Sequence, residues 1–146
     1  MYVRPPPSTS VVPNLTLCHT KVLLNSAAIL SGHAYAETVD GIEETFATNH
    51  LGHFLLTVLI LPRICAAATP SAPARIINVS SVGHSFIPFK LEEVGFEGGR
   101  TWGAMTAYVQ SKNANILFSL ELAKRLKHEN ILSFSLHPGC ECLTRQ

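Results

Sequence analysis

Three short apolar runs, each followed by a polar turn, most constrain the fold of this 146-residue chain. They occupy residues 22–24, 75–81 and 131–136, and each segment between them is long enough to hold a helix. Short apolar runs of this kind are typical of parallel strands buried on both faces, and parallel strands need crossover connections. We therefore expect a parallel α/β unit in the order strand, helix, strand, helix, strand, with right-handed crossovers.

Apolar residues at helical spacing fill both connections between these runs. The first predicted helix extends to Pro62, with Thr38 or Asp40 as its candidate N-cap. The second covers residues 107–127 and ends in a basic cluster that suits a helix C-terminus. We expect the glycine-rich residues 84–103, which precede the second helix, to form a surface insertion.

The chain divides into a short lead-in and one folded domain. Residues 1–20 are rich in proline, serine and threonine without periodicity, which indicates a flexible segment. Residues 21–146 carry the strand and helix pattern. The whole chain is 47% hydrophobic and 14% charged, which is apolar enough for a real core.

Composition also narrows the partners of the chain. The net charge of +1 and the absence of like-charge runs argue against nucleic acid, so a small molecule is the expected partner. The longest apolar stretch, residues 54–62, is too short to span a membrane, and no secretory signal is evident, so we expect a cytoplasmic protein. Four cysteines without a CxxC pair predict neither a metal site nor disulfides.

Tyr108 and Lys112 lie four residues apart on the second predicted helix, so both side chains share one face. An adjacent ammonium favours the phenolate form of a tyrosine, which makes the pair a candidate proton donor and acceptor. A solvated helix surface also commonly carries such a pair, and by spacing alone that reading is the more frequent one.

Other polar residues occupy places where they could meet a ligand. Ser81 ends the second apolar run and either faces a substrate oxygen or, with Ser80, satisfies backbone groups in the turn. Asn49 lies within an apolar helix, either solvated or buried against a carbonyl. His50 and His53 lack an evident third metal ligand, so we favour packed or exposed helix positions for both.

Taken together, five segments resemble the short-chain dehydrogenase/reductase family in the right order. They are the strand and loop over residues 22–28, the helix segment 46–54, the strand 75–81, the Tyr108-x-x-x-Lys112 pair and the turn His137-Pro138-Gly139. The sequence Ala-Tyr-x-x-Ser-Lys-x-Ala-Asn and the long gap before it are most similar to the retinol-dehydrogenase-like and WW-domain-oxidoreductase-like branch, including its fungal members.

The resemblance implies an NAD- or NADP-dependent oxidoreductase that moves hydride between the cofactor and an alcohol or carbonyl. The catalytic residues it implies are Asn49, Ser81, Tyr108 and Lys112, with Asn49 organising a proton relay through water. The cofactor-binding residues it implies are Asn25, Ala27, Tyr108, Lys112, Pro138 and Gly139.

One motif of the family is absent from the sequence. No Gly-x-x-x-Gly-x-Gly turn occurs, and Ala28 stands where the family has a glycine. We therefore expect a partial Rossmann-type three-layer fold, shortened at both ends, without the N-terminal glycine-rich βαβ half and with an open sheet edge. That edge is also a candidate for self-association. The alternative to an enzyme is a non-catalytic remnant that pairs with another protein through the same edge.

Overall fold

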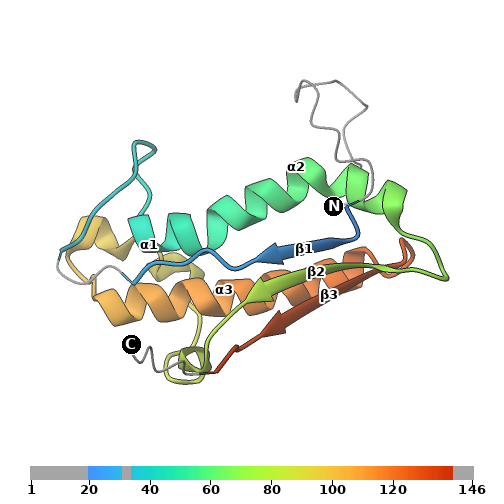
Figure 1. The fold of residues 1–146 in the computed structure, drawn as a ribbon. Helices are drawn as coiled ribbons and strands as arrows, with labels where there is room; N and C mark the ends of the chain where they lie inside the picture. The colour runs from blue at the N-terminus through green and yellow to red at the C-terminus, as the bar shows by residue number, and fades with distance from the viewer. Residues whose placement is uncertain (1–19, 31–33, 140–146) are drawn as a thin grey trace, which may run out of the picture.

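The computed structural model describes residues 20–30 and 34–139, so most of the predicted lead-in lies outside the described residues. The strands are parallel, in the order β1-β2-β3 (Figure 1). The main elements are β1 Val22–Asn25, α1 Glu44–Phe46, a π-helical turn Ala47–Leu51, α2 Gly52–Ala67, β2 Ala74–Val79, α3 Ala104–Arg125 and β3 Ile131–Leu136. This architecture confirms the predicted α/β class with a parallel sheet.

Both long helices pack against the same face of the sheet. The strand register places Leu23 beside Ile76, and Ile76 beside Ser133, on this face. Ile64 of α2 and Leu122 of α3 join Ile76 in one buried apolar cluster. The core therefore lies between one sheet face and a single helical layer.

The opposite face of the sheet carries no helix among the described residues. Five apolar strand side chains there are 40% to 55% exposed: Val22, Leu24, Leu132, Phe134 and Leu136. The expectation that these strands are buried on both faces is therefore wrong for the described part of the chain. The described residues form two of the three layers of a Rossmann-type fold, the sheet and one layer of helices. This agrees with the prediction of a partial fold.

The first helical run begins and ends later than predicted. Its N-cap is Glu43, not Thr38 or Asp40, because the Glu43 carboxylate accepts a hydrogen bond from the Phe46 amide over 2.6 Å. Pro62 lies inside α2, which continues to Ala67. Proline is tolerated there because Pro62 is exposed and water can reach the carbonyl that loses its partner.

The complete run Glu44–Ala67 is long and apolar enough, by length and composition, to cross a membrane. The shorter apolar stretch seen in the sequence did not indicate this. Its inner side, however, carries Asn49 and Thr57, which are fully buried and bonded to neighbouring parts of the α/β unit. We therefore describe the run as a helix of this domain, and the cytoplasmic location stays a prediction.

The insertion before α3 packs against the loop that precedes α1. Trp102 contacts Tyr35 edge to face, with ring centroids 6.3 Å apart, and its indole N–H donates to the buried Glu43 carboxylate over 3.1 Å. Gly99 has a φ of +95°, and a Cβ there would lie 2.7 Å from the Tyr35 ring. These contacts fix the segment that leads into α3.

Candidate active site

The polar residues singled out in the sequence gather where the parallel strands end. Ser81 follows β2 and Pro138 follows β3, while α3 supplies Tyr108 and Lys112 and the π-helical turn supplies Asn49 (Figure 1). In an open parallel sheet, ligands bind at the carboxyl ends of the strands. The structure therefore places these five residues at the end of the fold where a ligand site is expected.

Lys112 is the most deeply buried charged group of this site. Its side chain is 2% exposed, its Nζ lies 5.4 Å from the centre of the Tyr108 ring, and it donates to the Val79 carbonyl over 3.2 Å. Burial lowers the pKa of Lys112 below its ordinary value, because the charged form loses water. An ammonium has three N–H donors, so two have no protein acceptor among the described residues and are available to a ligand.

Ser81 occupies the turn that follows β2. Its Oγ accepts a hydrogen bond from the Gly83 amide over 3.2 Å, so it caps the short 3-10 turn Val82–Ser85. The neighbouring Ser80 is buried and donates to the Lys112 carbonyl over 2.8 Å. The backbone role considered for these serines is thus present, and the half-buried Ser81 keeps its hydroxyl proton for another acceptor.

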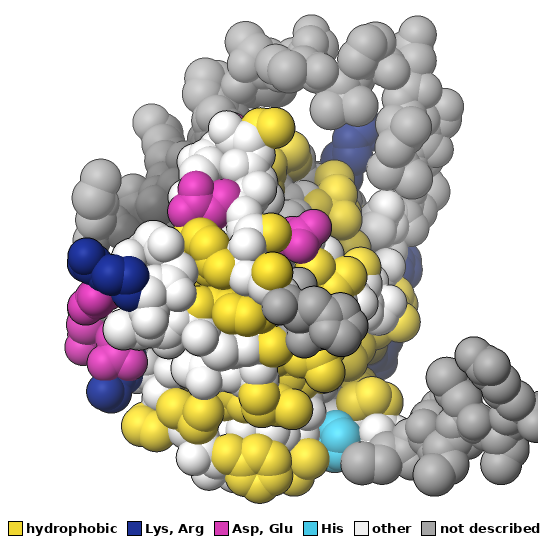
Figure 2. Space-filling view, turned by 90° about the vertical axis from the view of Figure 1, so that its left-hand side faces the viewer, with side chains coloured by type: hydrophobic (Ala, Val, Ile, Leu, Met, Phe, Trp, Pro, Cys, Tyr) yellow, Lys and Arg dark blue, Asp and Glu magenta, His cyan; other side chains and the backbone are white. Residues whose placement is uncertain are grey.

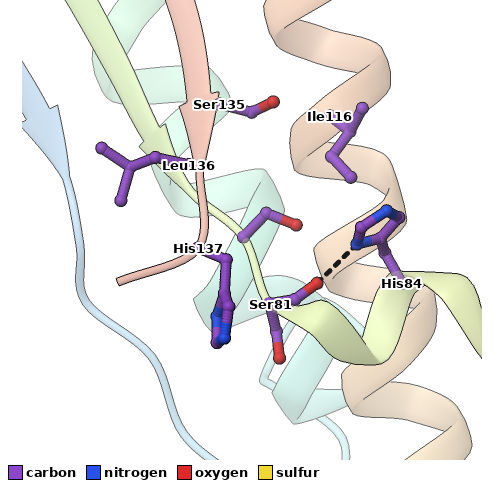
Figure 3. Close-up of a pocket in the computed structure, with 7 residues that line it drawn as sticks. Ser81, His84, Ile116, Ser135, Leu136 and His137 are labelled. Carbon is purple, nitrogen blue, oxygen red and sulfur yellow. Dashed lines mark hydrogen bonds between the residues drawn. The ribbon is translucent and has the colours of Figure 1, made fainter. Parts of the chain in front are cut away.

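A pocket of about 260 Å³ opens beside Ser81, between the ends of β2 and β3 and helix α3 (Figure 3). Its lining residues are Ser80, Ser81, His84, Ile116, Ser135, Leu136 and His137. In Figure 3 the side chains of Ser81 and His137 point the same way, while His84 is held by its contact with the Ser81 carbonyl at 2.6 Å. The pocket gives a small ligand room beside Ser81, although Tyr108 and Lys112 are not among its lining residues.

Asn49 is fully buried, and protein groups satisfy its side chain. Its Oδ1 accepts from the Ile29 amide over 2.8 Å, and its Nδ2 donates to the Ile29 carbonyl over 2.9 Å and to Ser111 Oγ over 3.1 Å. Ser111 in turn donates to the Tyr108 carbonyl over 2.7 Å. Asn49 therefore joins the loop after β1 to the turn of α3 that carries Tyr108.

The two histidines near Asn49 are packed residues. His53 Nδ1 donates to the Asn49 carbonyl over 3.0 Å, and His50 Nδ1 lies 2.9 Å from Asn115 Oδ1. Burial lowers the pKa of both imidazoles, so the neutral form is favoured. Within residues 20–30 and 34–139 no cluster of three or more histidine, cysteine or acidic side chains offers a metal site.

The residues expected to bind a cofactor differ in how they face the site. The Asn25 side chain is 1% exposed and donates to Thr57 Oγ1 over 3.0 Å and to Asn78 Oδ1 over 2.8 Å, so only its backbone can face a ligand. Ala27 is exposed in the loop after β1. The exposed Pro138-Gly139 turn has a φ of +98° at Gly139, a conformation that favours glycine.

Sequence reasoning did not single out Asn115, Thr57, Asn78 or Ser119, which bond buried groups between the sheet and the helices. A signal for part of this set is present in the sequence. Lys112, Asn115 and Ser119 are three and four residues apart, so they form a polar stripe on one face of α3. That stripe faces the sheet, where every polar group needs a partner.

A partial Rossmann-type sheet, with a serine, a tyrosine and a lysine near the carboxyl ends of its strands, defines a class of α/β proteins that bind ligands at this end of the sheet. The short chain dehydrogenase family matches residues 16–144. The chain therefore belongs to the short-chain dehydrogenase family.

Proteins of known sequence support this assignment. Mouse retinol dehydrogenase 11 is 43% identical over 121 residues, which make up 83% of this chain and 36% of that protein. A short-chain dehydrogenase/reductase of Armillaria gallica is 40% identical over 121 residues, covering 81% of this chain and 38% of its own length. The chain thus spans about a third of the length of these relatives, and the predicted resemblance to the retinol-dehydrogenase-like branch is confirmed.

Solved structures show the same fold. An uncharacterized protein from Mycobacterium paratuberculosis is 39% identical with a TM-score of 0.71, over 85% of this chain and 43% of that one. Pseudomonas aeruginosa RhlG, solved as its NADP active-site complex, is 27% identical with a TM-score of 0.63, over 84% and 43% of the two chains. The partial Rossmann-type fold is therefore confirmed.

Proposed function

We propose that this chain carries the catalytic centre of an NAD- or NADP-dependent oxidoreductase that interconverts an alcohol and a carbonyl compound. The observation that carries the proposal is the buried Lys112 ammonium, 5.4 Å from the Tyr108 ring and bonded to the last carbonyl of β2, two residues before Ser81. A buried ammonium beside a tyrosine provides what proton exchange at a substrate oxygen requires.

Tyr108 and Ser81 act on the same substrate oxygen in this proposal. In reduction, the Tyr108 hydroxyl gives its proton to the carbonyl oxygen, and the Ser81 hydroxyl donates a hydrogen bond to that oxygen as negative charge develops on it. In oxidation the Tyr108 oxygen takes the proton back. The Lys112 ammonium stabilises negative charge on the Tyr108 oxygen in both directions.

Asn49 acts by position in this scheme. The expected water relay through Asn49 has no support in its contacts, because Ile29 and Ser111 use its side-chain atoms, and His53 and Asn115 donate to its carbonyl. A relay needs an atom with a free hydrogen-bonding site. We therefore propose that Asn49 holds the Tyr108 turn of α3 in place.

The donor set near Lys112 fits one half of a nicotinamide dinucleotide. Two Lys112 N–H groups suit the ribose hydroxyls, and the backbone of Asn25 with Ala27 and the Pro138-Gly139 turn would border the nicotinamide. When bound, the cofactor supplies or accepts the hydride. The chain has no glycine-rich turn for the pyrophosphate, so we expect weak binding.

The substrate we propose is an apolar alcohol or aldehyde. The named relatives include retinol dehydrogenases, whose substrate is a largely apolar alcohol. Apolar side chains follow Ser81 closely in sequence and are well exposed: Val82 by 46%, Phe86 by 71% and Leu91 by 69%. Figure 2 shows hydrophobic side chains gathered on this end of the molecule. Apolar surface near the site would bind the body of such a substrate.

Calorimetric titration tests the cofactor part of this proposal. NAD and NADP, each up to about 1 mM, are titrated into the chain and into Lys112→Met. We expect weak binding of at least one cofactor by the chain and a clear loss of affinity in Lys112→Met. If neither cofactor binds, this polypeptide does not act as an oxidoreductase by itself.

The alternative, a non-catalytic remnant that pairs through an open sheet edge, predicts the opposite result. In the described residues β1 and β3 are the edge strands, and their uncovered face is apolar, so self-association there remains a proposal. Light scattering measures the mass of the chain during the same titrations. A monomer that binds cofactor would exclude the alternative, whereas an oligomer that binds none would favour it.

A further inference from the structure

Asn115 joins two backbone carbonyls, and one of them also accepts a hydrogen bond from Lys112. Its side chain is 1% exposed, and its Nδ2 donates to the Asn49 carbonyl over 3.0 Å and to the Val79 carbonyl over 3.1 Å. Because a carbonyl can only accept, these two bonds fix the orientation of the amide. The single side chain therefore connects the π-helical turn, the end of β2 and helix α3.

The remaining atom of the Asn115 amide is also engaged. Its Oδ1 lies 2.9 Å from His50 Nδ1, and the amide orientation makes His50 the donor. His50 is held in turn by aromatic rings of α1 and α3, with Phe46 5.3 Å and Phe118 5.9 Å away between ring centroids. The Asn115 amide is thus bonded to His50, Asn49 and Val79, so its position is fixed. A fixed amide can in turn fix the two carbonyls to which it donates.

The Val79 carbonyl is the point where Asn115 meets the proposed chemistry. This oxygen accepts from Lys112 Nζ over 3.2 Å as well as from Asn115. The two donors lie three residues apart on one face of α3, so they approach the same acceptor from successive positions. The position of that oxygen therefore affects where the ammonium rests relative to Tyr108.

We propose that Asn115 is a positioning residue that places the Lys112 ammonium beside Tyr108 by fixing the Val79 carbonyl and tying it to the Asn49 carbonyl. The catalytic meaning of this inference rests on the proposed function above. The structural part of the inference does not rest on that function. Lys112 and Asn115 both donate to the Val79 carbonyl whether or not the chain turns over a substrate.

The test is a titration of Lys112 in the full chain without cofactor. Carbon-13-labelled lysine is followed by NMR, and the Lys112 signal is assigned by its loss in Lys112→Met. In Asn115→Ala, Val79 has only the ammonium as a side-chain donor and water can enter the vacated space. Both changes favour the charged form, so the pKa of Lys112 rises toward its ordinary value of 10.5.

Asn113→Ala is the matched control. Asn113 lies on the same helix and donates a single bond, to the Ile87 carbonyl over 2.9 Å, without touching Val79 or Asn49. We expect the Lys112 titration of Asn113→Ala to match that of the unchanged chain. A general loosening of α3 would move Lys112 in both variants, and that result would overturn the proposal.

Asn115→Asp provides a second variant of nearly the same shape. An ionised aspartate cannot donate to either carbonyl and adds negative charge, so the pKa of Lys112 rises further than in Asn115→Ala. Circular dichroism verifies that each variant folds. A Lys112 pKa that is unchanged or lowered in a folded Asn115 variant would overturn the proposal.

Turnover separates this inference from the proposed function. If the chain reduces an apolar aldehyde, kcat falls and its pH profile shifts in Asn115→Ala but not in Asn113→Ala. If the unchanged chain shows no turnover, the proposed function fails, and the Lys112 titration still decides whether Asn115 positions the ammonium.

Discussion

The Lys112 ammonium donates to the Val79 carbonyl over 3.2 Å, so the helix that carries Tyr108 is bonded to the end of the strand that leads to Ser81. This contact brings a group from the second crossover to the second strand, although 33 residues separate them in sequence. The proposed chemistry depends on this junction, because α3 carries the Tyr108 and Lys112 pair while the turn after β2 carries Ser81, and both are proposed to act on one substrate oxygen. The predictions below test the junction and the parts of the fold that support it.

Replacing Ser81 by alanine should lower kcat by about 100-fold, because one donor to the developing oxyanion is lost. The fold should persist, since the Oγ only accepts from the Gly83 amide in a half-exposed turn. Steady-state kinetics of aldehyde reduction measure the effect. Ser85→Ala, which removes an exposed hydroxyl bonded to the Val82 carbonyl in the same turn, is the control and should keep its activity.

Replacing Asn49 by alanine should lower the free energy of unfolding by about 3 kcal/mol, because the buried Ser111 hydroxyl and two half-buried backbone groups of Ile29 lose their partner. Asn113→Ala, which removes one half-buried bond, should lower it by about 1 kcal/mol. Urea unfolding measures both values. Equal losses in the two variants would show that Asn49 does not have the structural role assigned to it.

The stability of the chain should fall as the pH drops below 6.5. Burial lowers the pKa of His50 and His53 below 6.5, so in this range the unfolded chain binds more protons than the folded chain. The contribution of these two histidines to the free energy of unfolding therefore rises with pH from the lowered pKa values up to about 6.5 and then levels off. The free energy of unfolding is measured by urea at several pH values between these limits. Its slope against pH should be smaller in His50→Gln and in His53→Gln than in the unchanged chain. An unchanged slope would contradict the lowered pKa of the replaced histidine.

Gly99→Ala should destabilise the chain more than Gly98→Ala. Both glycines have a positive φ, +95° and +66°, so alanine strains each by about 1 kcal/mol. Only at Gly99 would the added Cβ also meet the Tyr35 ring, at 2.7 Å, whereas nothing lies within 4 Å at Gly98. Thermal unfolding compares the two variants, and an equal decrease in Tm would show that the Tyr35 contact does not hold the insertion.

The sequence predicted the strand and helix order well because burial imposes the same periodicity on each element as the finished fold requires. The predictions were wrong where a tertiary contact determines where a helix begins or ends. Glu43 caps α1 because Trp102, 59 residues away, shares its carboxylate, and no local pattern in the sequence indicates that bond. Pro62 ends a helix in most sequences, but here it lies on the exposed side of α2 and the helix continues.

The site was predicted in part, for a related reason. Tyr108, Lys112 and Ser81 could be placed because the resemblance gave their order, and the structure brings their elements to the same end of the sheet. The polar stripe on α3 could have indicated that Asn115 faces the sheet, but not what it bonds to, because its partners are backbone carbonyls on two distant segments. Backbone acceptors carry no residue type that a sequence pattern can reveal.

The most direct test of the account follows the oxidation of NADPH or NADH by the chain in the presence of an apolar aldehyde. Tyr108→Phe is the variant, and Tyr35→Phe, a tyrosine bonded to Glu37 away from Lys112, is the control. We predict that the chain and Tyr35→Phe consume the reduced cofactor, while Tyr108→Phe is slower by about 100-fold or more. Equal rates in the chain and Tyr108→Phe, or no consumption by the unchanged chain, would contradict the proposed oxidoreductase.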